Sequence, residues 1–221
     1  MNLDLNGASF KLRIPAVMGI LNVTPDSFSD GGCFSDPSAA LEYAHEEGAQ
    51  IIDIGAESTR PGSTPVSAKE ELKRLLPVVN KLPKDRFILS IDSYKPEVQL
   101  AMMAEGVHMI NDVFGGNDTL YKAAAEKSIA LMLMHTSGTP EHMQQKTEYE
   151  DMLNDIARWL KHRADQAQEA GAPCVWVDPG IGFGKTLEQN ISLMHHLDKF
   201  SDIGNGIAIG TSRKSWIEKL T

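Results

Sequence analysis

Polar and charged residues follow almost every short apolar run of this chain, and their types suit a flat polar heterocycle together with an anion. Carboxylates and amides can pair with ring N–H, amino and oxo groups, and arginine and lysine can bind an anion. A helix start at Lys214–Ser215 would add free backbone N–H groups to such an anion site. The residues at these positions are Asn22, Asp53, Thr59, Arg60, Asp92, Asn111, Asp112, His135, Asp178, Ser212, Arg213, Lys214 and Ser215.

Each of these residues also has a plain structural interpretation. An aspartate after a strand is often the N-cap of the next helix. Asp53 is followed by more strand and can be a buried structural carboxylate, and His135 is more often a packed core histidine than a ligand. Convergence favours a site, because helix capping must be invoked separately at every strand. Four other histidines are interpreted as surface or packing residues: His45, His142, His195 and His196.

The stretch 178–186, DPGIGFGKT, has the glycines and the lysine of a phosphate-binding loop but not their spacing. A P-loop needs a glycine five residues before the glycine that precedes the lysine, and Pro179 stands there. The dinucleotide pattern G-x-G-x-x-G also fails, because Lys185 occupies the third glycine position after Gly180 and Gly182. This stretch therefore needs an explanation other than nucleotide binding.

The composition limits the classes of protein to which this chain can belong. A formal net charge of −9 over 221 residues argues against a nucleic-acid or anionic membrane surface. No apolar run approaches the ~18–20 residues of a membrane helix, and the first 15 residues lack the apolar region of a signal peptide. Cys33 and Cys174 lie far apart, outside any metal-type spacing, which indicates a reduced compartment. We expect a cytoplasmic protein that binds neither nucleic acid nor membrane.

Seven short apolar runs alternate with helical stretches. The runs are continuous, as expected for parallel strands covered on both faces, so the chain predicts a parallel α/β fold. An open doubly wound sheet and a closed (β/α)8 barrel both remain. We favour the barrel, because polar residues end nearly every strand and those ends converge at one mouth of a barrel, whereas an open sheet binds mainly at one switch point. The runs are 17–23, 51–55, 87–92, 108–112, 131–135, 175–179 and 206–210.

The segments between the runs carry end signals for helices and turns. Ser67 and Glu70 form a capping-box pattern, and Pro77 is expected to kink or split the helix that follows. An Asn6-Gly7 turn between apolar flanks predicts an N-terminal β-hairpin. No linker, low-complexity segment or short repeat interrupts the chain, so we expect residues 1–221 to form one domain.

Seven segments resemble the dihydropteroate synthase family of pterin-binding enzymes, in order and across nearly the whole chain. Two of them, NVTPDSFSDGG at 22–32 and ESTRPG at 57–62, are highly specific signatures. The full set is MGILNVTPDSFSDGG (18–32), GAESTRPGS (55–63), SIDSYKPEV (90–98), INDVFGG (110–116), LMHTSGTPEHMQ (133–144), DPGIGFGKT (178–186) and GTSRKS (210–215).

The resemblance implies a (β/α)8 barrel and a transferase of folate biosynthesis. In that family p-aminobenzoate displaces diphosphate from 6-hydroxymethyl-7,8-dihydropterin diphosphate, which gives 7,8-dihydropteroate. The C–O bond breaks largely before the amine attacks, so catalysis is mainly stabilisation of charge on the diphosphate and the pterin cation. The resemblance also implies a Mg²⁺ cofactor, a homodimer and competition of sulfonamides with p-aminobenzoate.

Family roles carry over by position. The resemblance implies that the pterin is bound by Asp92, Asn111, Met134, Asp178 and Lys214. It places the p-aminobenzoate and the anionic groups near Phe28, Thr59, Arg60, Pro61, Phe183 and Ser215. Asn22 would help to bind the Mg²⁺ that neutralises the leaving diphosphate. Catalytic roles fall to Arg60, Asp92 and Lys214.

The sequence departs from the family in two places. HTSG at 135–138 replaces the HMQG of many relatives, which should matter little. The family also has an eighth strand with an Arg-x-His pair and a last helix, whereas this sequence stops at SWIEKLT. Because a barrel closes only if its last strand pairs with strands seven and one, we expect the native polypeptide to continue past Thr221, so that the eighth βα unit is absent from this sequence.

Two other functions remain open from the sequence. The related pterin-dependent methyltransferases share the barrel and the Asp/Asn pterin contacts but lack the ESTRPG and SRKS pair. A non-catalytic pterin-binding fragment is motivated by the C-terminus, although no residue of the expected mouth is visibly lost.

Overall fold

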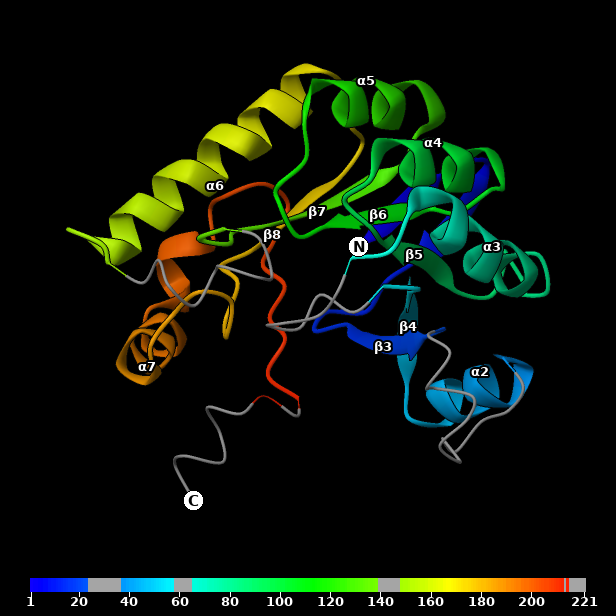
Figure 1. The fold of residues 1–221 in the computed structure, drawn as a ribbon, viewed down its shortest axis with the longest axis horizontal. Coiled ribbons are helices and arrows are strands. Elements are labelled where there is room, and N and C mark those ends of the chain that lie inside the picture. Colours follow the sequence, from blue (N-terminus) through cyan, green and yellow to red (C-terminus); the bar gives the residue numbers. More distant parts are fainter. Residues whose placement is uncertain (24–36, 58–64, 139–147, 213, 215–221) are drawn as a thin grey trace.

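The computed structural model describes residues 1–23, 37–57, 65–138, 148–212 and 214, with side chains 37–40 and 43 left out (Figure 1). Strands and helices alternate along these residues. The elements are β1 (Asn2–Leu5), β2 (Ala8–Lys11), β3 (Val17–Asn22), α2 (Pro37–Glu46), β4 (Ala49–Gly55), α3 (Ala68–Val79), β5 (Ile88–Asp92), α4 (Pro96–Ala104), β6 (Met109–Asp112), α5 (Asp118–Lys127), β7 (Ala130–Met134), α6 (Met152–Glu169), β8 (Val175–Asp178), α7 (Leu187–His195) and the 3₁₀ helix η2 (Leu197–Phe200).

Six strands form one parallel sheet in the order β3-β4-β5-β6-β7-β8, so each new strand is added beside the previous one. The predicted seventh run joins the far side of β8 through a single parallel bridge between Val177 and Ile207, rather than as a full strand. Helices α3 to α6 lie in an arc along the outside of the sheet (Figure 1). Strands added in sequence order, each followed by an outer helix, are the arrangement of a (β/α)8 barrel, which confirms the expected fold class.

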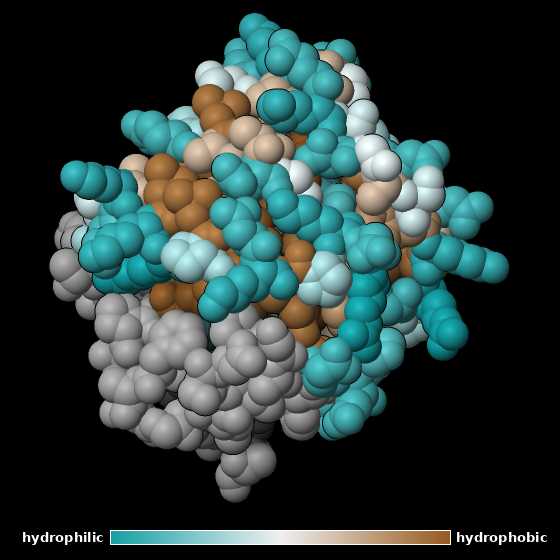
Figure 2. All heavy atoms as spheres, turned by 90° about the vertical axis from the view of Figure 1, so that its right-hand side faces the viewer, coloured by the Kyte–Doolittle hydropathy of each residue, from teal (hydrophilic) through white to brown (hydrophobic). Residues whose placement is uncertain are grey.

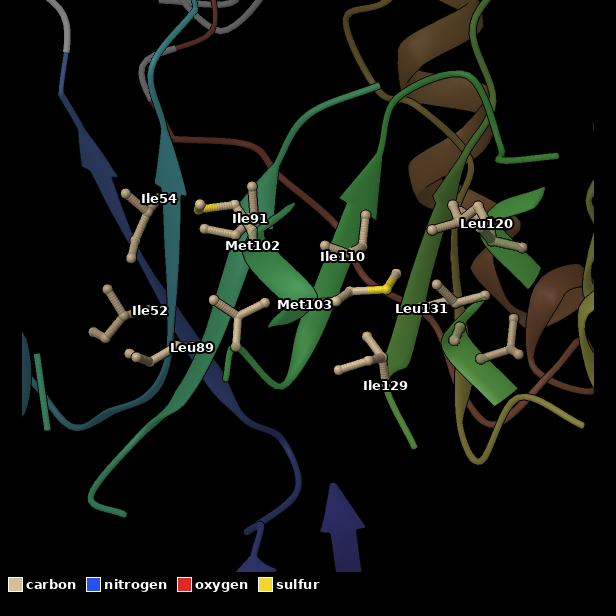
Figure 3. Packing of buried hydrophobic residues seen from close by; sticks show 14 of the residues in the cluster. Ile52, Ile54, Leu89, Ile91, Met102, Met103, Ile110, Leu120, Ile129 and Leu131 are labelled. Atoms are coloured by element: carbon tan, nitrogen blue, oxygen red, sulfur yellow. The ribbon is translucent and has the colours of Figure 1, made fainter. Parts of the chain in front are cut away.

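Both faces of the sheet are buried from β4 to β8, which explains the continuous apolar runs there. On the outer face Ile52, Ile54, Leu89 and Ile91 lie in the same cluster as helix residues such as Met102 (Figure 3). The alternate strand positions form a second cluster: Ile51, Ile88, Met109, Ala130, Met132 and Trp176, together with Leu3, Leu5 and Leu12 from the N-terminal segment. Alternate side chains point to opposite faces of a strand, so apolar residues at every position supply two separate cores.

The N-terminal hairpin is confirmed, and it lies against the amino-terminal end of the sheet. Asn6 and Gly7 have φ values of 45° and 81°, as a type I′ turn requires. The Asn6 amide donates to the carbonyl of Val107 at 2.8 Å, just before β6. With this end of the sheet covered, the opposite, carboxyl end is left for a site.

Helix α3 begins at the predicted N-cap, since Ser67 accepts from the backbone N–H of Glu70. The helix that we expected to be kinked or split at Pro77 is not split, because α3 continues to Val79. Pro77 removes one intrahelical N–H donor, but only two residues of α3 follow it, so little of the helix depends on the turn that it weakens. On the side where α2 and α3 lie in Figure 1, hydrophilic side chains dominate the surface, with hydrophobic areas between them (Figure 2).

The parallel sheet has two edges, one at β3 and one at the bridge residue Ile207. In the described part of the chain no strand lies between these edges. Val17 and Ile20 of β3 are 52% and 63% exposed, and Ile209 is 46% exposed. Apolar side chains are therefore accessible to solvent at both edges of the sheet.

Candidate active site

The carboxyl ends of four neighbouring strands place site residues in one row. The strand register pairs Asn22 with Gly55, Gly55 with Asp92, and Asp92 with Asn111. A Cβ on Gly55 would lie 3.5 Å from Asp92 Oδ2 and 3.6 Å from Asn22 Oδ1. The glycine therefore leaves open the space between the Asn22 amide and the Asp92 carboxylate.

Asp92 carries a hydrogen-bond acceptor without a protein donor. Its Oδ1 is buried and has no hydrogen-bond partner among the described residues. Burial raises the pKa of Asp92 well above its usual value, and the charges of Asp53, Glu71, Asp112 and Glu57 raise it further. A buried carboxyl group in this condition gains most from a ligand that presents N–H groups to it.

Asp53 holds the neighbouring Asn111 in place. It is 2% exposed and accepts from Ser90 Oγ at 2.6 Å and from Asn111 Nδ2 at 2.9 Å. The buried structural interpretation of Asp53 is thus confirmed. Because the amide nitrogen of Asn111 is engaged with Asp53, its carbonyl oxygen is the group suited to accept from a ligand.

Met134 and Asp178 continue the row on the next strands, where the register pairs them. Met134 is buried, and Asp178 Oδ1 accepts from the backbone N–H of Gly180 at 2.7 Å. Burial raises the pKa of Asp178, and this is partly offset by the Gly180 hydrogen bond and by the charges of Lys214 and Lys185. Asp178 is therefore a second carboxyl group with a raised pKa at the same end of the sheet.

The loop after β8 binds lysine side chains with its carbonyl groups. Lys185 Nζ donates to the carbonyls of Gly180 at 2.9 Å and Phe183 at 3.0 Å. Lys214 Nζ donates to the carbonyl of Ile181. A P-loop would direct its N–H groups at phosphate, whereas this loop directs carbonyls at ammonium groups, a geometry that does not suit a bound phosphate.

The same loop is fixed further by amide and hydroxyl groups. Asn190 accepts from the N–H of Gly182 at 2.7 Å and donates to the carbonyl of Thr186 at 2.8 Å. Ser137 donates to the carbonyl of Gly184 at 2.9 Å. Gly180, at φ 72°, packs so closely that a Cβ would lie 1.9 Å from a neighbouring backbone oxygen, so only glycine fits there.

Lys214 and Phe183 lie beside each other next to Asp178. Lys214 Nζ is 4.7 Å from the centre of the Phe183 ring, a cation–π contact. Burial lowers the pKa of Lys214, and the charge of Asp178 partly offsets this. Thus two residues expected at the pterin, Asp178 and Lys214, and one expected at the aminobenzoate, Phe183, form one cluster.

His135 is a packed core residue, as interpreted from the sequence. It is buried with its ring edge-on to Trp159 at 5.2 Å, and its Nδ1 lies 3.4 Å from Lys185 Nζ. Burial and the charge of Lys185 lower the pKa of His135 to about 3. It is therefore neutral at physiological pH.

A second internally paired lysine, Lys95, does not stand out in the sequence; its side chain is 15% exposed and contacts Glu57, which follows β4. Lys95 Nζ donates to a carboxylate oxygen of Glu57 and, at 2.6 Å, to Glu71 Oε2. Tyr94 donates to Glu57 Oε1 at 2.8 Å, and the N–H of Val66 donates to Glu57 Oε2 at 3.0 Å. These contacts join the two ends of the segment between Glu57 and Val66.

The other expected site residues lie outside the described residues. They are Phe28, Thr59, Arg60, Pro61 and Ser215. Among the residues that the structure does describe, no three His, Cys, Asp or Glu side chains gather as a metal-binding group.

Comparison with known proteins identifies the group to which this arrangement belongs. Residues 18–221 match the pterin binding enzyme family. The chain is 40% identical over its whole length to dihydropteroate synthase of Escherichia coli K12 and covers 80% of that protein. This chain belongs to the pterin-binding enzymes. Within them it groups with the dihydropteroate synthases, so it is an enzyme of the transferase class.

Solved structures of the same group have the same fold. A Yersinia pestis dihydropteroate synthase in a sulfonamide drug complex superimposes with a TM-score of 0.87 at 41% identity, covering all of this chain and 82% of the other. The Xanthomonas albilineans enzyme with 4-aminobenzoic acid gives a TM-score of 0.86 at 40% identity, covering 99% and 81%. Separately, no helix in the described ranges has the length and apolar character needed to cross a membrane.

Proposed function

We propose that this enzyme condenses 6-hydroxymethyl-7,8-dihydropterin diphosphate with p-aminobenzoate to form 7,8-dihydropteroate and diphosphate. The observation that carries the proposal is the row of polar groups at the carboxyl ends of β3 to β8, in which Asp92 keeps a buried oxygen without a protein donor. An aminopyrimidine edge presents adjacent N–H donors, which a carboxylate accepts side by side. If these residues only capped helices, they would need neither to lie in one row nor to leave an Asp92 oxygen without a donor.

Residues from the ends of β5, β6, β7 and β8 hold the pterin ring, together with Lys214. Asp92 and Asp178 accept from ring and amino N–H groups, Asn111 accepts through the amide oxygen that Asp53 leaves available, and Lys214 donates to the oxo side. Met134, buried between them in the sheet, packs against the ring. This set distinguishes the edge of the ring by its pattern of donors and acceptors.

The reaction breaks the C–O bond between the pterin methylene and the diphosphate, which departs with the bonding electrons. The amine of p-aminobenzoate then forms the C–N bond and loses a proton. Catalysis rests on stabilising opposite charges at the two ends of the broken bond: Asp92 and Asp178 near the pterin cation, Arg60 and Lys214 near the anion. A pterin-dependent methyltransferase would not need the aminobenzoate residues.

The aminobenzoate is proposed to lie against Phe183 and the neighbouring Lys214, with Phe28, Thr59, Arg60, Pro61 and Ser215 completing its site. The related Xanthomonas enzyme was solved with 4-aminobenzoic acid and the Yersinia enzyme with a sulfonamide. By this analogy sulfonamides are inhibitors of the present enzyme that compete with p-aminobenzoate.

A Mg²⁺ ion fits the exposed Asn22 end of the row. Mg²⁺ in phosphate-transferring sites is usually held by one or two protein oxygens together with water and phosphate oxygens. Asn22 offers one amide oxygen beside the open space at Gly55. When bound, the ion would neutralise charge on the diphosphate.

The proposed setting is a homodimer in the cytoplasm. The thiol of Cys174 is buried, and burial raises its pKa to about 12, as suits a structural cysteine in a reduced compartment. The net charge of −9 supports small-molecule substrates over nucleic acid or an anionic membrane as partners.

The test is diphosphate release with both substrates, combined with calorimetry of pterin binding. Release should require p-aminobenzoate and Mg²⁺. Asp92→Ala and Asp178→Ala should each weaken pterin affinity by ~30-fold or more, since each removes a charged acceptor from a shielded site. The exposed Asp85→Ala is the matched control and should bind as the unaltered enzyme does. Pterin affinity unchanged in both site variants would remove these residues from the pocket and contradict the proposal.

A further inference from the structure

The side-chain amine of Lys185 makes its polar contacts with groups of the protein itself. It is 4% exposed, and its Nζ contacts the carbonyls of Gly180 at 2.9 Å and Phe183 at 3.0 Å and Nδ1 of His135 at 3.4 Å. A lysine ammonium group has three donors. Two of its positions are taken by the carbonyls and the third by His135 Nδ1, so none remains to contact a substrate in either protonation state.

The carbonyls that Lys185 binds belong to the residues that set the site geometry. Gly180 accepts from Lys185 through its carbonyl and donates through its N–H to Asp178 Oδ1 at 2.7 Å. Phe183 also accepts from Lys185, and its ring lies 4.7 Å from Lys214 Nζ. The Lys185 amine therefore contacts Gly180, which in turn donates to the Asp178 carboxylate, and it contacts Phe183, the aromatic residue proposed to pack against p-aminobenzoate.

The glycines of this loop make such a fixed point necessary. Gly180, Gly182 and Gly184 all have positive φ, and glycine has the most backbone freedom to lose on folding. The loop therefore has no intrinsic preference for the conformation that directs its carbonyls inward, and the conformation must be imposed by contacts.

We propose that Lys185 is a positioning residue of this enzyme, which holds the Gly180 and Phe183 carbonyls so that Asp178 and Phe183 face the two substrates. The proposal rests on the function proposed above. It assigns Lys185 no contact with either substrate. Its loss should therefore weaken the binding of both substrates through the loop while leaving the Asp92 side of the row unaffected.

The test is a double-mutant cycle on pterin affinity measured by calorimetry. Lys185→Met should weaken pterin binding by ~10-fold, since the carboxylate it serves loses its alignment. In the Asp178→Ala background the same substitution should cost less than ~2-fold, because the group through which it acts is gone. In the Asp92→Ala background it should again cost ~10-fold. The KM for p-aminobenzoate should rise in parallel with the pterin effect.

The outcomes separate this inference from the proposed function. If the unaltered enzyme binds no pterin and releases no diphosphate, the function fails. If the unaltered enzyme is active but Lys185→Met binds both substrates within ~2-fold of it, or loses equal affinity in the two backgrounds, the positioning role is wrong. Lys185→Gln keeps an NH₂ group with two donors on a side chain one atom shorter and should lose ~3-fold, which allows the cycle to be run if the Met variant does not fold.

Discussion

Lys95 and Lys185 both lie near the row of polar residues, and they differ in the groups that accept their hydrogen bonds. Lys95 is bound by the carboxylates of Glu57 and Glu71. Lys185 is bound by two backbone carbonyls and a neutral histidine. Lys95 helps to hold the two ends of the segment from Glu57 to Val66. Lys185 holds the loop after β8.

The acceptors decide the protonation of the two amines. Burial alone lowers the pKa of a lysine. For Lys95 the hydrogen bonds and charges of Glu57 and Glu71 outweigh burial, and its pKa is raised. For Lys185 burial dominates and lowers the pKa to about 7, with the charge of Asp178 opposing it. Similar anchoring positions thus produce one permanent ion pair and one amine that can lose its charge near neutral pH.

The largest effect is expected when the charged cluster is broken. Lys95→Met leaves the buried carboxylates Glu57 and Glu71 without a cation, which should lower the free energy of unfolding by ~3–5 kcal/mol. Urea unfolding measures it. The exposed pair of Lys161 with Asp165 is the control, and Lys161→Met should cost less than ~0.5 kcal/mol. A loss below ~1 kcal/mol for Lys95→Met would mean that the carboxylates are already protonated or hydrated.

The fold and the row of site residues could be predicted because both depend on local pattern. Continuous apolar runs indicate parallel strands, and the ends of parallel strands meet at one mouth. Asn22, Asp92, Asn111 and Asp178 follow directly from that rule. The N-terminal hairpin followed from its Asn-Gly turn in the same way.

The two lysine clusters could not be predicted because their partners are distant or are backbone atoms. Glu71 lies in the first turn of α3, where an acidic residue is typical of any exposed helix start, yet in the folded chain it is buried and contacts Lys95. The carbonyls around Lys185 point inward because of positive φ values at glycines, which no side-chain pattern specifies. The lysine and glycines of 178–186 are visible in the sequence, but their pattern suggests only a phosphate-binding loop, which their spacing excludes.

An intermediate effect is expected in the pH dependence of stability. Between pH 7 and 10.5 the unfolded chain holds the Lys185 proton while the folded chain has released it, so stability rises with pH in this window. From pH 7 to 8.5 the unaltered enzyme should gain ~1.5 kcal/mol more stability than Lys185→Met. Lys214 faces the same cluster and contributes a slope of the same sign, but it is present in both proteins and cancels.

Lys95→Met provides the matching control for that slope. The pKa of Lys95 lies above its ordinary value, so this group stays protonated in both states up to pH 8.5. Its removal should lower stability at every pH without changing the slope. Equal slopes for the unaltered enzyme and Lys185→Met would show that Lys185 keeps its proton, and the contrast between the two lysines would then disappear.

The smallest expected difference, about 0.5–1 kcal/mol, lies between the losses of a single hydroxyl on each cluster. Tyr94 donates to the Glu57 carboxylate at 2.8 Å, and Ser137 donates to the Gly184 carbonyl at 2.9 Å. Hydrogen bonds to charged groups are stronger than those to neutral ones. Tyr94→Phe should therefore cost ~1.5–2 kcal/mol and Ser137→Ala about 1 kcal/mol in urea unfolding. If the serine change costs as much as the tyrosine change, the charge of the acceptor is not what distinguishes the two clusters, and their difference must lie in burial alone.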